Sequence, residues 1–116
     1  MKIGVTSQNF RTITGHAGKA RRFFVYEGVN SDDLQLVNKI DLPKNESVHE
    51  SNPTEKHPID DFDILITAGC GEGFQRKMEN RGIKLIKTSE QDPLVAAKNV
   101  IDGKPLPLAP VEIKTK

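Results

Sequence analysis

The sequence of 116 residues has a single cysteine, one tyrosine and no tryptophan. A lone Cys70 excludes an intrachain disulfide framework and a cradle of four cysteines for a metal cluster. Charge is balanced, with 17 Lys and Arg against 16 Asp and Glu, so no global field attracts nucleic acid. The sequence has neither a signal-peptide pattern nor an apolar run of the ~20 residues that cross a bilayer. We therefore expect a cytoplasmic protein without a nucleic-acid or membrane partner.

The residues that are present suit one α/β domain. Hydrophobic residues make up 35% of the chain, enough for a single core at this length. Segments 2–7 and 23–29 are rich in β-branched and aromatic residues and predict strands. Turn formers at 30–33, followed by apolar residues spread through 34–42, predict that the second of these strands begins a β-hairpin with room for a bulge.

The second half of the chain alternates helical and strand patterns. A short helical turn is expected at 59–62, before an apolar run at 63–68 that is typical of a strand covered on both faces. Helical spacing then predicts a helix within 74–82, alternation predicts a strand at 83–87, and a good N-cap begins a helix within 92–103. The order predicts a mixed sheet, because crossover units add parallel strands beside the antiparallel hairpin.

Two segments are predicted to lie outside this pattern. The polar stretch 43–58 is interpreted as either a mobile lid or a disordered excursion. Its histidines, His49 and His57, are expected to be solvated. The proline-containing segment 104–116 is predicted to be an extended tail without a role in the core, which leaves 1–103 as the domain.

The loop 15–22, Gly-His-Ala-Gly-Lys-Ala-Arg-Arg, lies between two predicted strands and favours a negatively charged ligand. Glycine allows the backbone to approach a ligand, imidazole can bind iron or copper, and the cations supply positive field. The candidate binding residues of this loop are Gly15, His16, Gly18, Lys19, Arg21 and Arg22.

A second glycine loop, 69–73, follows the predicted buried strand and adds Gly69, Gly71 and Gly73 as candidates. Ligands of α/β sheets bind beyond the carboxyl ends of parallel strands, so we expect His16 and Cys70 to face one pocket. Cys70 has two interpretations, as a small buried hydrophobic residue or as a ligand whose thiol pKa is lowered at a helix N-terminus.

The sequence contains parts of three enzyme motifs but does not complete any of them. The 69–73 loop is neither a dinucleotide fingerprint nor a Walker A motif. Two-metal chemistry needs clustered carboxylates, but Asp60, Asp61 and Asp63 precede their strand, at the end away from the predicted pocket. A Cys-His hydrolase built on Cys70 and His16 lacks an orienting third group. No catalytic residue is therefore assigned.

Three stretches resemble the dinitrogenase iron-molybdenum cofactor biosynthesis family, which includes NifX-type proteins and the C-terminal domain of NifB. They are MKIGVTS at 1–7, GHAGKARRFFVYE at 15–27 and DILITAGCGEGFQRKMENRGIKL at 63–85. The resemblance runs from residue 1 to about residue 103. Ala17 stands where the family usually has phenylalanine, and Cys70 stands where other members often have an apolar residue.

The resemblance implies a ribonuclease H-like three-layer fold, with a mixed five-stranded sheet and helices on both faces. It also implies binding or transfer of a metal-sulfur cluster, the iron-molybdenum cofactor or a precursor, with His16 as a ligand and cluster donor or acceptor proteins as partners. We interpret the chain as a small cluster carrier, not an enzyme, with His16 and Cys70 as candidate metal ligands. The alternatives are a regulatory protein-interaction module and a small α/β enzyme that uses the 69–73 loop as an anion site.

Overall fold

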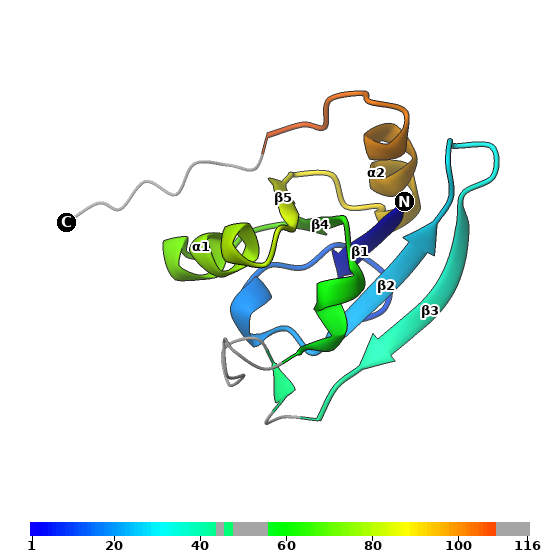
Figure 1. Ribbon diagram of the computed structural model, residues 1–116. Helices are drawn as coiled ribbons and strands as arrows, with labels where there is room; N and C mark the ends of the chain where they lie inside the picture. The colour runs from blue at the N-terminus through cyan, green and yellow to red at the C-terminus, as the bar shows by residue number, and fades with distance from the viewer. Residues whose placement is uncertain (44–45, 48–55, 109–116) are drawn as a thin grey trace.

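The computed structural model describes residues 1–43, 46–47 and 56–108 (Figure 1). In these residues five strands form one sheet, namely β1 (Lys2–Thr6), β2 (Arg22–Glu27), β3 (Gln35–Asp41), β4 (Ile64–Thr67) and β5 (Lys84–Lys87). The helices are α1 (Glu72–Asn80) and α2 (Pro93–Ile101), with short 3-10 helices η1 (Ala17–Lys19) and η4 (Pro58–Asp61). In the described ranges, no helix is long and apolar enough to cross a membrane.

The sheet is mixed, as predicted, with the strand order β3-β2-β1-β4-β5. The hairpin of β2 and β3 pairs antiparallel with β1, while β4 and β5 extend the other side of β1 in parallel. The predicted bulge is also present, because the pairing of β2 with β3 shifts register between Val25 and Tyr26. The carboxyl ends of β1 and β4 therefore meet at one edge of the sheet.

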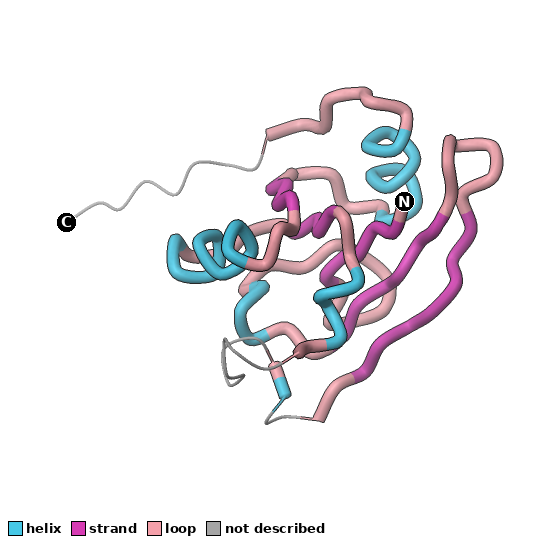
Figure 2. The backbone as a smooth tube through the Cα atoms, in the orientation of Figure 1, coloured by secondary structure: helices cyan, strands magenta, loops and turns pink. Residues whose placement is uncertain are grey.

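Two apolar clusters lie on opposite faces of the sheet and make the fold three-layered. Adjacent residues of β2 point to opposite faces, so Phe23 packs in the cluster beneath α1 while Phe24 packs in the cluster beneath α2. The first cluster includes Phe74 and Met78 of α1, as their helical spacing predicted. Figure 2 shows the two helices as separate cyan coils on different sides of the strands. The expectation of helices on both faces is confirmed.

The helix ends follow the predicted signals. The Asp92 side chain caps α2 by accepting a hydrogen bond from the N–H of Leu94 at 3.0 Å, and Pro93 occupies the first helical position. Gly82 follows α1 with φ +76°, and Gly103 follows α2 with φ +75°. Only glycine adopts this left-handed conformation readily, which explains why the helices stop there.

His57 is buried, so the expectation of a solvated side chain is wrong. The N–H of Ile59 donates to Nδ1 of His57 at 3.2 Å, and the ring therefore donates from Nε2 to the Glu46 carbonyl oxygen at 2.7 Å. This histidine caps η4 and has a structural role. The predicted lid or excursion at 43–58, with His49, falls mostly on 44–45 and 48–55, outside the described residues.

The beginning of the predicted tail packs on the domain. The Thr88 hydroxyl donates to the Pro107 carbonyl oxygen at 2.6 Å, and Leu106 lies against the apolar cluster beneath α2. A proline lacks an N–H but keeps its carbonyl acceptor, so an extended proline segment can still pair along a sheet edge. The prediction of no core role is therefore wrong for Leu106, while 109–116 lie outside the described residues.

Asp60 joins η4 to the end of α1 by an ion pair with Arg81. Burial acts to raise the pKa of Asp60, but the N–H of His57 and the Arg81 guanidinium hold it below its usual range. The carboxylate therefore contributes stability that is present above the unfolded pKa of about 3.9 and is lost as the pH falls through the folded value.

We expect Asp60→Asn to lower the free energy of unfolding by about 1–2 kcal/mol at pH 7, because the amide removes the charge from this partly buried pair. Denaturant titrations of both proteins between pH 7 and pH 3 should show a constant gap in the free energy of unfolding above about pH 5 and a narrowing gap below it. A gap of the same size across the whole range would contradict this role of the carboxylate.

Candidate functional site

The loops after β1 and β4 enclose a groove of about 650 Å³ at the carboxyl ends of these two strands. His16 and Cys70 both line it, so the predicted convergence of the two loops on one pocket is confirmed. The residues that line this groove are Gly15, His16, Ala17, Gly18, Lys19, Ala68, Gly69, Cys70, Gly71, Gly73 and Phe74.

Buried threonines at the strand ends hold the two loops together. The Thr14 carbonyl oxygen accepts the N–H of Ala68 at 3.1 Å. The hydroxyls of Thr6 and Thr67 lie 2.6 and 3.1 Å from the same oxygen, and 2.8 Å from each other. A direct hydrogen bond from the Ala17 N–H to the Gly69 carbonyl oxygen, at 3.2 Å, joins the two loops within the groove lining. This arrangement was not predicted from the sequence, although a threonine at the end of each apolar strand is a usable signal.

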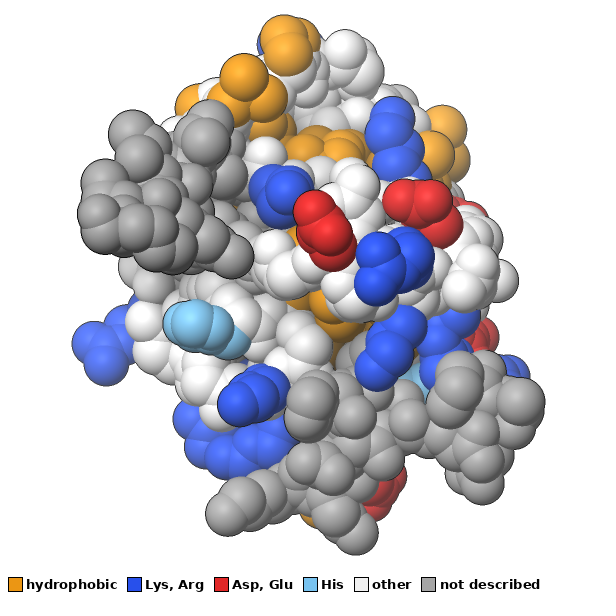
Figure 3. Space-filling view, turned by 90° about the vertical axis from the view of Figure 1, so that its left-hand side faces the viewer, with side chains coloured by type: hydrophobic (Ala, Val, Ile, Leu, Met, Phe, Trp, Pro, Cys, Tyr) orange, Lys and Arg blue, Asp and Glu red, His pale blue; other side chains and the backbone are white. Residues whose placement is uncertain are grey.

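His16 presents an exposed imidazole at the groove. Its backbone is left-handed, with φ 53° and ψ 48°, and it precedes η1, where its carbonyl accepts the N–H of Lys19 at 2.9 Å. A non-glycine residue in this conformation is uncommon and often marks a functional position. Within the described part of the chain the imidazole makes no hydrogen bond, so no protein group occupies the ring nitrogen that carries the lone pair. Figure 3, which views the α1 side of the molecule, shows several lysine and arginine side chains on this face.

Cys70 is half-buried directly before Gly71, which is the N-cap residue of α1. Burial raises the pKa of the Cys70 thiol, and the charge of Lys87 acts in the opposite direction. The predicted lowering of the pKa at the helix N-terminus is therefore wrong, because desolvation outweighs the local positive field. The side chain also packs against the apolar cluster beneath α1 while it lines the groove.

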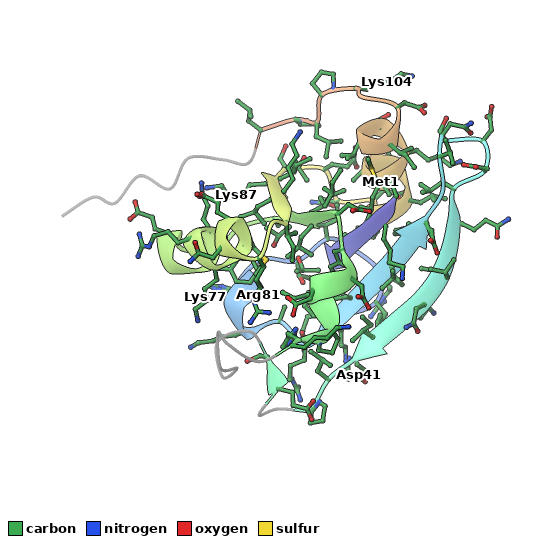
Figure 4. All side chains as sticks on the ribbon, viewed as in Figure 1. Met1, Asp41, Lys77, Arg81, Lys87 and Lys104 are labelled. Atoms are coloured by element: carbon green, nitrogen blue, oxygen red, sulfur yellow. The ribbon has the colours of Figure 1, made fainter. Side chains whose placement is uncertain are left out.

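Of the three predicted cations, only Lys19 lines the groove. The Arg22 guanidinium donates to the Gln8 carbonyl oxygen at 3.1 Å and lies 3.4 Å from Asp41 Oδ1. Figure 4 shows Asp41 at the end of β3. Arg22 is the first residue of β2 and pairs with Asp41 in the sheet, so the Arg22 side chain lies beside β3 and not in the groove. Arg21 is also absent from the groove lining. No carboxylate is among the described residues that line the groove.

The side chains around the groove do not form a complete set of ligands for a metal ion. Across 1–43, 46–47 and 56–108, no group of three or more His, Cys, Asp or Glu side chains is placed to hold a metal ion. A closed tetrahedral or octahedral site for a single ion needs at least three protein ligands. The groove instead offers an imidazole and a thiol beside glycine backbone and one lysine.

The geometry also bears on the enzyme alternatives. Asp63 accepts the N–H of Lys2 at 2.8 Å, at the opposite end of β1 from the groove, as the sequence analysis expected. Among the described residues no hydrogen bond joins His16 to Cys70, and no third side chain orients the imidazole. The hydrogen-bonded sequence of nucleophile, base and orienting group that hydrolases use is therefore not formed among the described residues.

The chain is similar to known proteins over most of its length. The family model described as "Dinitrogenase iron-molybdenum cofactor" matches residues 1–103. The crystal structure of PH0822 is similar with a TM-score of 0.67 and 20% identity, covering 93% of this chain and 94% of that one. The NMR structure of the Thermotoga protein TM1290, which belongs to the DUF35 family, has a TM-score of 0.61 and 12% identity, covering 98% of each chain.

A comparison with curated protein sequences finds no significant match. The two structural likenesses, at 20% and 12% identity, support the shared fold. The family match is evidence of membership as well as of fold, because it spans both groove loops and nearly the whole described domain. The chain belongs to the dinitrogenase iron-molybdenum cofactor family.

Proposed function

We propose that the groove binds a metal-sulfur cluster, the iron-molybdenum cofactor or a related precursor, as cargo. The observation that carries this proposal is the lining of the groove. It brings an exposed imidazole and a thiol together without a carboxylate and without a closed ligand set, in a chain of the iron-molybdenum cofactor family. The protein then acts as a carrier or accessory protein in cofactor assembly, not as an enzyme.

The ligand chemistry suits a cargo that must be released. Imidazole and thiolate bind iron and related metals, and an assembled cluster supplies most of its own ligands as sulfide. His16 and Cys70 would therefore hold a cluster by one or two bonds. Such a cluster is easier to pass to an acceptor protein than a metal enclosed by four side chains.

The electrostatics favour an anionic cargo. Iron-molybdenum-sulfide assemblies carry negative charge, and Lys19 is the cation among the described residues that line the groove. The N-terminus of α1 begins at the same groove, since Gly71 and Gly73 line it, and helix N-terminal N–H groups stabilise anions. No carboxylate is among the described residues that line the groove, although Glu72, in the first turn of α1, acts against this field from the side.

The test is anaerobic loading of the wild-type protein with isolated iron-molybdenum cofactor. After desalting, iron and molybdenum are counted per chain and the absorption spectrum is recorded. We expect retained metal in the ratio of the cofactor and a chromophore that comigrates with the protein. A protein that stays colourless and metal-free overturns the proposal. Turnover of a nucleotide or ester by metal-free protein would favour the enzyme alternative, and a stable metal-independent partner would favour the interaction module.

A matched pair of cation substitutions tests the charge contribution. Lys19→Gln should weaken cofactor retention severalfold at low salt, because it removes the positive charge that lines the groove. Arg22→Gln removes the same charge outside the groove and should leave retention unchanged. Both are measured by titrating protein against cofactor at low and high ionic strength, where the Lys19 effect should shrink. Equal losses in the two variants would show that general charge, not the groove, sets the affinity.

A further inference from the structure

The nine glycines of the chain divide into two sets. Outside the groove, each glycine is required by the fold. A Cβ at Gly4 would lie 2.2 Å from the Phe62 ring, and one at Gly28 would lie 2.8 Å from a backbone atom of the neighbouring turn. Gly82 and Gly103 adopt the left-handed φ values that end α1 and α2. These four positions have ordinary steric or conformational reasons for glycine.

The five groove glycines have neither of these two reasons, although Gly71 is also the N-cap residue of α1, where glycine is common. None of them has a φ in the left-handed region. A Cβ at Gly15 or Gly18 would meet its nearest atom at 3.6 or 3.7 Å, which is ordinary contact. At Gly69, Gly71 and Gly73 a Cβ would meet nothing within 4 Å. All five line the groove. The glycines that the fold does not require sterically are therefore the same glycines that line the groove.

Glycine without a structural reason lowers stability, because it gives the unfolded chain more conformational freedom than alanine does. Gly73 lies within the first turn of α1, where alanine is a better helix former. Glycine at such a position leaves open space over the backbone, which allows a ligand to approach the main chain closely. A binding site is therefore where we expect a glycine that the fold does not need.

We infer that Gly69, Gly71 and Gly73 form a bare main-chain ledge that determines how large a cargo the groove accepts. The inference rests on the proposed function and specifies its cargo class as a bulky polyatomic anion that lies directly on the backbone. A single metal ion, held by side chains that reach out to it, has no need of such a ledge. The glycines are then the specificity-determining residues of the groove, while His16 provides attachment.

A graded series at two ledge positions tests this inference. Gly69→Ala/Gly73→Ala and Gly69→Leu/Gly73→Leu add side chains of increasing size and leave His16, Lys19 and Cys70 in place. We expect the alanine variant to melt at or above the wild-type temperature. Loading with isolated iron-molybdenum cofactor should fall with side-chain size, by at least about tenfold for the leucine variant, as expected when the seating of a bound metal group is disturbed.

The control is Gly82→Ala, which should melt below the wild type because of its left-handed φ and should load cofactor normally once folded. If the wild type and the leucine variant load alike, the ledge inference is overturned and the proposed function stands. If the alanine variant melts well below the wild type, the glycines serve the fold and the inference is again overturned. If the wild type itself retains no cofactor, the proposed function and the inference fall together.

Discussion

His16→Asn is expected to lose about nine-tenths or more of the cofactor that the wild type retains, with little change in melting temperature. The imidazole is exposed at the groove and makes no hydrogen bond within the described residues, so its removal leaves no buried group unpaired. Its loss removes one of the two soft donors, His16 and Cys70, among the described residues that line the groove. Even a disturbed outer contact of a metal site typically costs about 10–100-fold in affinity, and a lost ligand should cost at least as much.

Asparagine is the appropriate replacement because of the backbone at this position. His16 has φ 53°, a left-handed conformation that asparagine adopts more readily than alanine. His16→Ala would mix loss of the ligand with strain in the loop. Retained iron and molybdenum per chain are the readout, and the melting curve checks the fold. A variant that loads like the wild type would remove His16 from the site and leave Cys70 as the candidate ligand.

Gly4→Val is expected to have the largest effect on stability, about 3 kcal/mol or more, or to prevent folding. Gly4 lies in the central strand β1, and an added Cβ would lie 2.2, 2.3 and 2.7 Å from three atoms of the Phe62 ring. The ring has no free space to enter, because Phe62 is 4% exposed and lies 6.1 Å from Phe23 between ring centroids. Relief requires movement of the strand or of η4.

A second substitution makes the Gly4 prediction specific. Gly4→Ala should be destabilised for the same reason, and Phe62→Ala should cost stability by leaving a cavity. The double variant should be more stable than the sum of the two losses predicts, because the methyl group enters the space that the ring has left. Denaturant unfolding of the four proteins measures this coupling. Strictly additive losses would show that the ring does not determine the requirement for glycine.

The sequence predicts the sheet well because its signals are local. Apolar runs, turn residues and the cap at Asp92 each act within a few residues, and the right-handed crossover rule then leaves few arrangements. The groove follows from the same reasoning, since two loops that leave parallel neighbouring strands must meet. The close packing of Phe62 over Gly4 has no local signal, because it joins residues that only the finished fold brings together.

The failed predictions for Arg22 and His57 come from hydrogen bonds that the composition of a segment does not reveal. Arg22 belongs to a cationic run, but β2 begins there and directs its side chain to Gln8 and Asp41. His57 lies in a polar stretch whose composition predicts exposure. Its ring is nevertheless hydrogen-bonded to the Glu46 carbonyl oxygen and to the Ile59 N–H. Composition gives the average environment of a segment, while a single capping contact decides the burial of one residue.

The most direct test of cargo binding in the groove is an amide nuclear magnetic resonance map of the protein before and after loading with paramagnetic iron-molybdenum cofactor. Signals close to a paramagnetic cluster broaden, so the affected amides locate the cargo without reference to any substitution. We expect broadening at 15–19 and 68–74, the two loops that line the groove, and sharp signals at 28–34, the hairpin turn. Broadening centred on the hairpin or on 104–108, with the groove loops unaffected, would contradict binding in the groove.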